Sequence, residues 1–458
     1  MNKENRNILL TCGVILLIVI LCLSVVIAIG AGIFLVSPKN QVAPTSTLPL
    51  PTPLPTSSTG SDLDMSIATQ MDLIQSQVIV LRGLDPTQAI SRMLLSGDQL
   101  RENVINDFLS EYTPQDAQRD ARVLHLLGLL PPGFDLVDFY TELYSEQIAG
   151  YYDNEAQAMY VVQGTAFGGN ERMTYAHEYV HVLQDQAFDF IGGLKYDDEN
   201  CEADSERCAG IQALIEGDAT LTELKWFQEY STQQDYEDIM EFYQAYQSPV
   251  YDQAPNYMQK DFMFPYEKGQ QFVQHLFDRG GYKAINNAYT NVPVSTEQIL
   301  HPEKYPYDKP LEVELPDLSS ALGPGWQETE RNVMGEWYTY LLLAHGYDPQ
   351  FRVPEQKAED AAEGWGGDTY LVYENENTAE TVFVMVSLFD TTRDLDQYVS
   401  TFKDYGDLRW GNPADRSKNE SLWQKDGIYS LFINDAESTT WIMAPRMDLL
   451  QSIRQTLP

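Results

Sequence analysis

The segment from His177 to His181 reads His-Glu-Tyr-Val-His, and it constrains the fold more than any other stretch of the chain. Its two histidines can bind one metal ion together if the segment is helical. Two histidines four positions apart lie on one face of an α-helix, one turn above each other. Both imidazoles can then reach one Zn²⁺, and Glu178 projects beside them, where it can take a proton from water. Residues 172–188 contain neither glycine nor proline, so the sequence predicts a helix here.

A third metal ligand is predicted on a second helix, from Ala209 to about Tyr230. Glu216 lies there among apolar residues, where an unpaired carboxylate is costly and a nearby cation would compensate it. Two histidines, a glutamate and a water are a common ligand set of catalytic zinc sites. The alternatives are a zinc ion with a purely structural role, and a Glu216 that lies in solvent beside Asp218.

These motifs resemble those of the gluzincin metallopeptidases, whose third zinc ligand is a glutamate on a downstream helix. The resemblance is carried by His177-Glu178-x-x-His181 and by Glu216-Gly217-x-Ala219. The chain is also similar to a family of bacterial membrane-anchored proteins predicted to be zinc proteases. The shared segments are residues 146–153, 176–186, 216–219, 296–305 and 364–368.

Two residues are candidates for the donor that stabilises the oxyanion formed during hydrolysis. The segment Tyr266-Glu267-Lys268-Gly269 is similar to one in gluzincin aminopeptidases, where the tyrosine has this role. His301 precedes Pro302 in a predicted loop, from which a side chain can reach a cleft. The sequence favours Tyr266, with His301 second. The alternative roles are a core aromatic for Tyr266 and a turn residue for His301.

The expected activity is hydrolysis of a peptide or protein substrate, with Glu178 as the base. The segment Gln157–Val161 lacks the acid that would hold a free amine in an aminopeptidase, so an endopeptidase fits better. The alternatives are a cell-surface binding or scaffolding protein with a zinc-stabilised fold, and a zinc hydrolase of a non-peptide amide. Glu178 favours an enzyme, because metal binding alone does not require it.

Residues 8–36 carry no charged side chain and are long enough to span a bilayer as a helix. A cleaved signal peptide would have a shorter apolar core. Lys3 and Arg6 precede the segment, so the positive-inside rule places the N-terminus in the cytoplasm. The sequence therefore predicts a signal anchor over residues 1–37, a single-pass location in the cell membrane and an extracytoplasmic catalytic domain. Residues 38–61, rich in Pro, Thr and Ser, would form a linker.

Charge and cysteine content limit the partners. The formal net charge of −39 repels nucleic acid, which we do not expect as a partner. Cys201 and Cys208 are the cysteines outside the apolar segment, with six residues between them. A disulfide is the simplest arrangement in an exported loop, and a second metal site is the alternative.

The predicted fold class is α+β and mainly helical. Residues 62–140 read as helices, and residues 141–358 read as a gluzincin-like catalytic domain. Within that domain, residues 146–162 read as a hairpin whose second strand either offers an edge to a peptide or simply packs in the core. Residues 359–458 alternate strand and helix patterns, so they should form a small α+β module.

Overall fold

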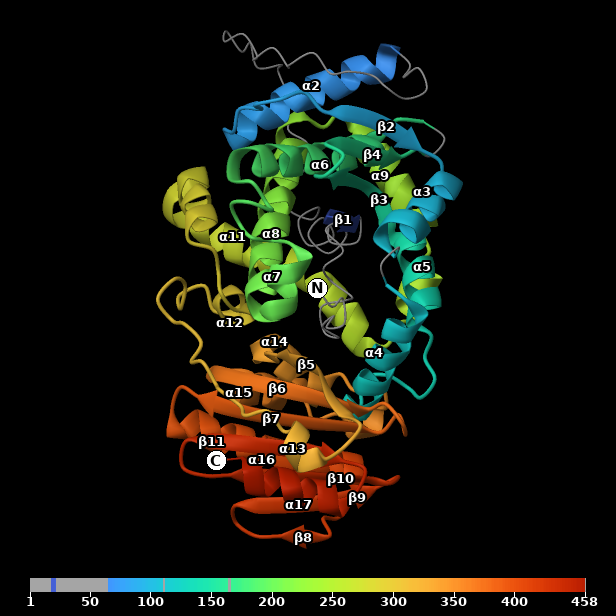
Figure 1. Ribbon diagram of the computed structural model, residues 1–458. Coiled ribbons are helices and arrows are strands. Elements are labelled where there is room, and N and C mark those ends of the chain that lie inside the picture. The colour runs from blue at the N-terminus through green and yellow to red at the C-terminus, as the bar shows by residue number, and fades with distance from the viewer. Residues whose placement is uncertain (1–17, 22–64, 110–111, 164–165, 458) are drawn as a thin grey trace.

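Two β-sheets organise the computed structural model, which describes residues 18–21, 65–109, 112–163 and 166–457 (Figure 1). A four-stranded sheet lies among the helices of the N-terminal half, and a seven-stranded sheet forms the C-terminal part. The N-terminal half contains α2 (Met65–Arg82), β2 (Ser91–Leu95), α3 (Gly97–Asn103), a π-helical turn η1 (Val104–Phe108), α4 (Pro114–Leu127), α5 (Leu136–Gln147), β3 (Ile148–Asp153), β4 (Ala158–Val162), α6 (Gly169–Phe188), α7 (Asp198–Ala203), α8 (Ser205–Tyr230), α9 (Gln233–Ala245), α10 (Pro249–Asp252), α11 (Asn256–Thr290) and α12 (Thr296–Leu300). The C-terminal part contains α13 (Ser319–Leu322), β5 (Trp326–Asn332), α14 (Gly335–Ala344), a 3₁₀ turn η2 (Pro349–Phe351), α15 (Glu355–Ala362), β6 (Trp365–Asn375), β7 (Thr381–Phe389), α16 (Thr392–Trp410), β8 (Asp415–Arg416), β9 (Glu420–Lys425), β10 (Ile428–Asn434), β11 (Ser438–Ala444) and α17 (Met447–Thr456).

The small sheet has the order β1-β3-β4-β2, where β1 is Ile18–Leu21. Strands β3 and β4 form the predicted hairpin, with Gly150 opposite Val161, and β2 runs parallel to β4. The turn between β3 and β4 is held by Asp153, whose carboxylate accepts hydrogen bonds from the backbone N–H groups of Glu155 and Ala156. The second strand of the hairpin, β4, lies between β3 and β2 and offers no edge, and the outer strands of this sheet are β1 and β2.

The structure corrects the predicted fold class and localisation, both of which included a transmembrane helix over residues 8–36. Residues Ile18–Leu21 of that segment form strand β1, which pairs antiparallel with β3. The three residues Ile-Val-Ile at its start branch at Cβ, and such side chains favour extended backbone. In the part of the chain that the structure describes, no helix has the length and apolarity needed to cross a membrane. This finding contradicts the predicted single-pass location; the rest of the segment, and residues 38–61, lie outside the described residues.

The C-terminal sheet is antiparallel throughout, in the order β5-β6-β7-β11-β10-β9-β8. The sequence predicts strands over residues 369–373, 381–388, 427–433 and 439–443, and the structure confirms them as β6, β7, β10 and β11. It misses the edge strands β5 and β8 and the neighbouring β9; the residues of β5, Trp326–Asn332, are mostly polar. Side chains of α16 pack on one face of this sheet, and those of α13 and α17 pack on the other.

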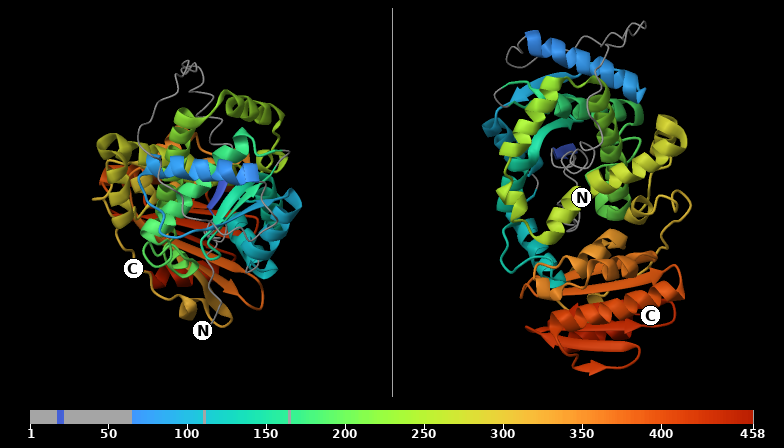
Figure 2. Two further views of the ribbon diagram at one scale, coloured as in Figure 1. Left: turned by 90° about the horizontal axis from the view of Figure 1, so that it is seen from above. Right: turned by 180° about the vertical axis from the view of Figure 1, so that it is seen from behind.

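A single hydrophobic core joins the two halves, because side chains of α4, α8, α11 and α14 belong to the same buried cluster as those of α16 and the large sheet. Helix α4 ends at Gly128, which has a left-handed φ of +81°. The guanidinium of Arg409, on α16, donates to the carbonyl oxygens of Leu126 and Leu127 there. The views in Figure 2 show the C-terminal sheet lying against the N-terminal helices.

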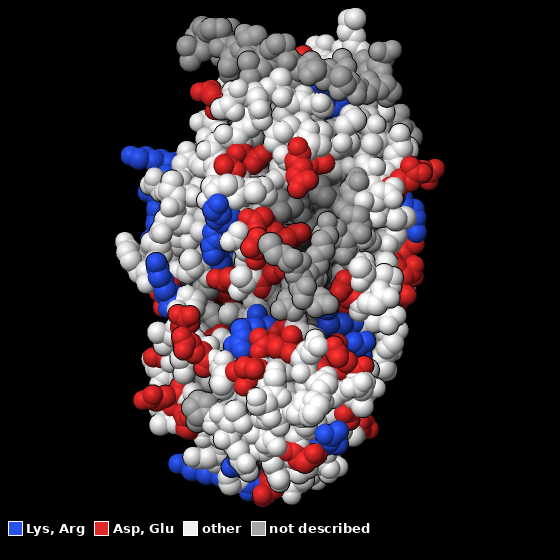
Figure 3. All heavy atoms as spheres, viewed as in Figure 1, with Lys and Arg blue, Asp and Glu red and all other residues white. Residues whose placement is uncertain are grey.

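Acidic side chains are spread over the whole face drawn in Figure 3, with smaller groups of Lys and Arg between them. The predicted disulfide is confirmed: Cys201 of α7 and Cys208 of α8 are bonded, with Cα atoms 5.4 Å apart. The bond fixes the start of α8, a 26-residue helix that packs against both α6 and α11.

Candidate metal centre

Helix α6 carries the His-Glu-x-x-His segment and is buried along most of its length. It begins after Gly168, whose backbone N–H donates to Glu171 Oε2 at 3.0 Å. This contact satisfies one of the amides that a helix N-terminus leaves without an intrahelical acceptor. The helix predicted over residues 172–188 is confirmed, and it starts three residues earlier, at Gly169.

The three predicted ligands converge. The Nε2 atoms of His177 and His181 lie 3.3 Å and 3.5 Å from Glu216 Oε2, and all three side chains are at most 1% exposed. Ligand atoms held about 2.0–2.1 Å from a tetrahedral zinc ion are about 3.3–3.4 Å apart. The observed separations therefore match the spacing of zinc ligands, and they are long for ordinary N–H···O hydrogen bonds.

The opposite nitrogens of both rings are already occupied. His177 Nδ1 lies 3.0 Å from Glu223 Oε2, and His181 Nδ1 lies 2.8 Å from Gln184 Oε1. Both partners are acceptors, so each Nδ1 carries a proton, and it is Nε2 that presents a lone pair when the ring is neutral. Metal-bound histidines are usually held in this way by an outer carboxylate or carbonyl.

Polar atoms without a partner surround the same point. His181 Nε2 and Glu216 Oε1 are buried and form no hydrogen bond with the described residues. Such atoms are costly unless something else satisfies them. Two imidazole lone pairs and a carboxylate suit a zinc ion, so the residues present fit the metal that the sequence predicts.

The charges of the ligand groups are coupled. Burial alone would lower the pKa of His177, but hydrogen bonds with Glu216 and Glu223 raise it to about 10. Burial lowers the pKa of His181. Burial opposes the charged form of Glu216, but His181 and His177 outweigh it and lower the pKa of that carboxyl. A metal ion that binds here therefore competes with a proton on His177.

Glu178 is fully buried, and neither carboxylate oxygen forms a hydrogen bond with the described residues. Burial, and then the charges of Glu216 and Glu223, raise its pKa well above the usual value. Strand β3 passes close by: a Cβ atom on Gly150 would lie 2.8 Å from Thr174 Cγ2 and 3.5 Å from Glu178 Cγ. Only glycine lets the strand approach α6 at this point.

Tyr266 reaches the centre from α11. Helices α8 and α11 touch backbone to backbone, because a Cβ atom on Gly217 would lie 2.2 Å from Gly269 O. These two glycines follow Glu216 and Tyr266 closely in the sequence, so the contact brings both side chains to one place. Burial and the carboxylates of Glu216 and Glu178 raise the pKa of Tyr266 well above its usual value. Its hydroxyl therefore stays neutral and able to donate.

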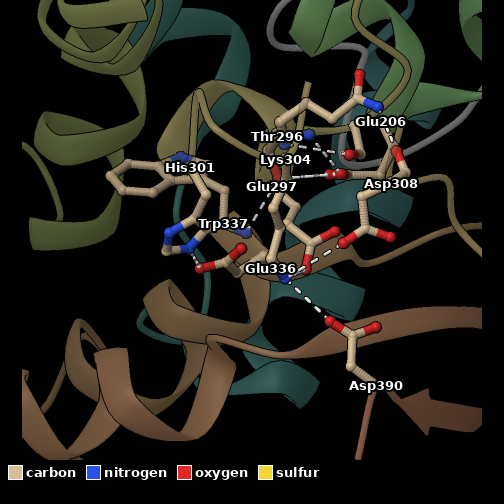
Figure 4. Close-up of polar contacts among 11 residues, drawn as sticks. Glu206, Thr296, Glu297, His301, Lys304, Asp308, Glu336, Trp337 and Asp390 are labelled. Atoms are coloured by element: carbon tan, nitrogen blue, oxygen red, sulfur yellow. Dashed lines mark hydrogen bonds and ion pairs between the residues drawn. The ribbon is translucent and has the colours of Figure 1, made fainter. Parts of the chain in front are cut away.

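His301 lies in a different cluster, drawn in Figure 4, where its Nε2 is 2.8 Å from Glu336 Oε1. In the same cluster Thr296 donates to Glu206 near the start of α8. Glu206 precedes Glu216 by ten residues, which is about 15 Å along a helix. The structure therefore groups Tyr266, and not His301, with the predicted ligands.

A second group of acids, Glu297, Asp308 and Asp390, also has the spacing of a metal site. Lys304 Nζ lies among them, 2.7 Å from Glu297 and 2.9 Å from Asp390 (Figure 4). The ammonium group already supplies the positive charge, so these acids form an ion-pair cluster.

Three residues near the centre were missed by sequence reasoning. Glu223 follows Glu216 by seven positions, and Gln184 follows His181 by three, so helical spacing could have indicated both. Tyr196 is also close, since burial and the charge of Glu216 raise its pKa. Nothing in the local sequence of Tyr196 points to this position.

A cavity of about 530 Å³ lies beside the N-terminal end of α6. Its lining includes Glu146 and Ile148 near the start of β3, Glu171 on α6 and Asp238 on α9. The predicted ligands and Glu178 do not line it. The cavity therefore borders the same helix and strand as the ligand cluster without including it.

Comparison with known proteins gives a match in the C-terminal part of the chain, away from the predicted ligands. Residues 322–454 match the family model described as Domain of unknown function (DUF8575). This match spans the large sheet from β5 to α17 and excludes the ligand cluster. No curated protein and no solved structure matches the chain.

Proposed function

We propose that this protein is a zinc-dependent peptidase, with His177, His181 and Glu216 as its metal ligands. The observation that supports this most strongly is the convergence of three ligand atoms beside a buried carboxylate, Glu178, which has no hydrogen-bond partner among the described residues. A site that only stabilised the fold would not need Glu178. A bound zinc ion would supply a Lewis acid that polarises a carbonyl and lowers the pKa of water.

Glu178 is the proton carrier in this proposal. Its carboxylate would accept a proton from the attacking water at Oε1 or Oε2 and later give it to the leaving amine. A raised pKa suits that second role, because a general acid must hold its proton near neutral pH. A divalent cation beside it would restore the charged form for the first role.

Tyr266 is the proposed oxyanion donor. A neutral phenol donates a hydrogen bond without bringing a charge that must be neutralised. Its proximity to Glu216 and Glu178 supports this role, and Pro265 and Gly269 fix its position on α11.

The side of β3 that pairs with β1 is the proposed position of the substrate backbone. An extended peptide that took the place of β1 would bind β3 through main-chain hydrogen bonds. In this chain β1 pairs there antiparallel, opposite Tyr151 and Tyr152, so this side of the strand can hold an extended segment. Gly150 of the same strand lies against Glu178, which would set a bound peptide close to the base.

The test uses the purified full-length chain, a peptide library derived from a proteome, and a chelator. Cleavage that the chelator abolishes and added zinc restores is the expected result, with one zinc ion per chain. His177→Ala should lose the metal and all cleavage. A wild-type protein that binds no zinc, or cleavage that survives the chelator, would contradict the proposal.

A further inference from the structure

A continuous series of buried polar side chains leads from helix α2 to the ring of His181. Arg82 belongs to α2, Asp218 to α8, and Gln184 and His181 to α6, and each of the four is 0% exposed. Helix α2 lies far from the metal ligands in sequence. Its Arg82 guanidinium nevertheless lies 2.9 Å from Asp218 Oδ1, two residues after the ligand Glu216.

The side-chain amide of Gln184 has one orientation that satisfies its neighbours. Its Nε2 lies 3.0 Å from the carbonyl oxygen of Ile215 and 3.0 Å from Asp218 Oδ2. A backbone carbonyl can only accept hydrogen bonds, and Asp218 Oδ2 already accepts from Arg82 and Tyr289, so the NH₂ group must face both oxygens. A flipped amide would set its oxygen against two other oxygens. Gln184 Oε1 is therefore directed at His181.

This orientation determines the tautomer of His181. Gln184 Oε1 lies 2.8 Å from His181 Nδ1, and an amide oxygen cannot donate, so the proton of the neutral ring sits on Nδ1. The lone pair is then on Nε2, the atom that faces Glu216. His177 has a carboxylate, Glu223, as its outer partner, which accepts in either orientation. An amide can present either a donor or an acceptor to the ring. Of the two outer partners, therefore, only Gln184 needs its own neighbours to fix its orientation.

Asp218 must remain an acceptor for this arrangement to hold, and Arg82 ensures that it does. The Arg82 Nε and Nη2 atoms donate to Asp218 Oδ2 at 3.0 Å and 2.9 Å, and Tyr289 donates its hydroxyl to the same oxygen at 2.9 Å. An arginine stays charged even when buried, and with Tyr289 it supplies three donors to Oδ2, so this oxygen can only accept from Gln184. The guanidinium also lies 4.8 Å from the ring centroid of Tyr282, which favours the cation.

We propose that Arg82 is a positioning residue of the metal centre: with Asp218 it fixes the amide of Gln184, and thereby keeps His181 in the tautomer that binds a metal ion. This inference rests on the proposed function in one respect, that His181 is a ligand. The tautomer itself is a property of the metal-free protein, so the two ideas can fail separately.

Asp218→Leu is the main test, because it removes Oδ2, the one oxygen that accepts from Arg82, Tyr289 and Gln184, with little change in volume. The Gln184 amide then keeps only the Ile215 carbonyl as an acceptor, so it should no longer hold the His181 proton on Nδ1 alone, and Nε2 should carry part of it. Ring-nitrogen NMR of the six histidines in zinc-free protein should show that shift. Competition with a chromophoric chelator should show zinc affinity lowered about 10–100-fold, the usual effect of losing an outer partner.

Two further variants test the arrangement while the Asp218 carboxylate stays in place. Gln184→Met removes the amide at nearly constant volume and should cause a similar loss of zinc affinity. Arg82→Lys keeps a cationic donor beside Asp218, so the His181 tautomer should be retained and the loss of affinity should be smaller. Both variants leave the Asp218 side chain in place, and they test the idea even if Asp218→Leu fails to fold.

The matched control is Asp235→Leu. Asp235 is 2% exposed and pairs with Arg172 of α6 at 3.1 Å, so its loss also weakens the packing of the proposed metal-binding helix. We expect a lower free energy of unfolding with an unchanged His181 tautomer and zinc affinity. Equal losses of affinity in Asp235→Leu and Asp218→Leu, or a wild-type tautomer in Asp218→Leu, would overturn the inference. A tautomer shift in a protein that binds no zinc would contradict the proposed function and leave the positioning role intact.

Discussion

Glu178 and Glu216 are both buried acids beside His177, yet their surroundings move their pKa values in opposite directions. The histidines lower the pKa of Glu216, while burial raises that of Glu178. A carboxylate that stays ionised suits a metal ligand, and one that can hold a proton near neutral pH suits an acid–base role. The opposite directions of the two shifts therefore support the different roles proposed for the two glutamates.

Glu178→Gln removes the base and leaves every ligand atom in place. We expect zinc content to equal that of the wild type and turnover to fall about 10²–10⁴-fold, the range typical of a lost general base. Metal analysis and cleavage of one identified peptide measure both quantities. Full activity in this variant would contradict the proposed mechanism.

Tyr266→Phe removes a hydroxyl and almost no volume. Loss of an oxyanion donor typically lowers kcat roughly 10²–10³-fold. His301→Ala is the comparison, and we expect less than a tenfold change in kcat because His301 pairs with Glu336 in another cluster. Zinc content is checked in both variants. A larger loss of kcat in His301→Ala would reverse the two roles.

At the scale of elements, the crossing of α8 and α11 at Gly217 and Gly269 brings Tyr266 toward Glu216. The helices approach so closely that a methyl group on Gly217 would overlap the Gly269 carbonyl. Helix separation at this point therefore controls the distance between a ligand and the proposed oxyanion donor.

Gly217→Ala should push the two helices apart. Overpacking of this kind costs about 1–3 kcal/mol, so the free energy of unfolding should fall by that amount. Turnover should fall as well, because Tyr266 moves away from Glu216. Gly97→Ala is the control, since a Cβ there meets no atom within 4 Å, and it should change stability by less than about 0.5 kcal/mol. Denaturant unfolding of the two variants distinguishes this contact from a general effect of alanine.

Much of the site could be predicted because its parts follow helical spacing. The histidines, Glu178 and the helix that carries them depend on local sequence alone, and Glu216 was indicated by its apolar neighbours. Arg82 could not be found in this way, because its partner lies 136 residues away and no spacing rule connects them. Strand β5 was missed because its side chains are mostly polar and its order comes from pairing with β6. The apolar segment at residues 8–36 led to the wrong prediction of a helix, because composition alone cannot distinguish a helix from the strand formed at Ile18–Leu21.

At the scale of the whole molecule, contacts at the start of α8 connect the two halves. Ser205 of α8 donates its hydroxyl to Asn332 Oδ1 and to the carbonyl oxygen of Val333. Glu206 of α8 accepts from Thr296, and a Cβ on Gly335 would collide with its carboxylate. On the C-terminal side of this junction, Asp368 at the start of β6 accepts the backbone N–H groups of Met334 and Gly335 and the indole N–H of Trp365. The matched family domain is therefore attached to α8 through hydrogen bonds as well as through the shared core.

Stability should depend on the charge of Asp368. Burial raises its pKa to about 6, despite the three donors, from an unfolded value near 3.8. The folded state then binds the proton more tightly, so this residue adds stability below about pH 6 and loses that contribution as pH rises through 6. Between pH 7 and pH 5 the wild type should gain about 1.4 kcal/mol relative to Asp368→Asn. Urea unfolding at the two pH values measures this difference, and the same pH dependence in both proteins would refute it.

The contact of Arg409 with the end of α4 has a consequence for synthesis of the chain on the ribosome. The carbonyl of Leu127 and its donor are 282 residues apart in sequence. At translation speeds of about 5–20 residues per second, α4 emerges roughly 15–55 s before its partner exists. During that interval the apolar side chains of α4 have no α16 and no large sheet to pack against, so the common core can be completed only after the C-terminal part has been made.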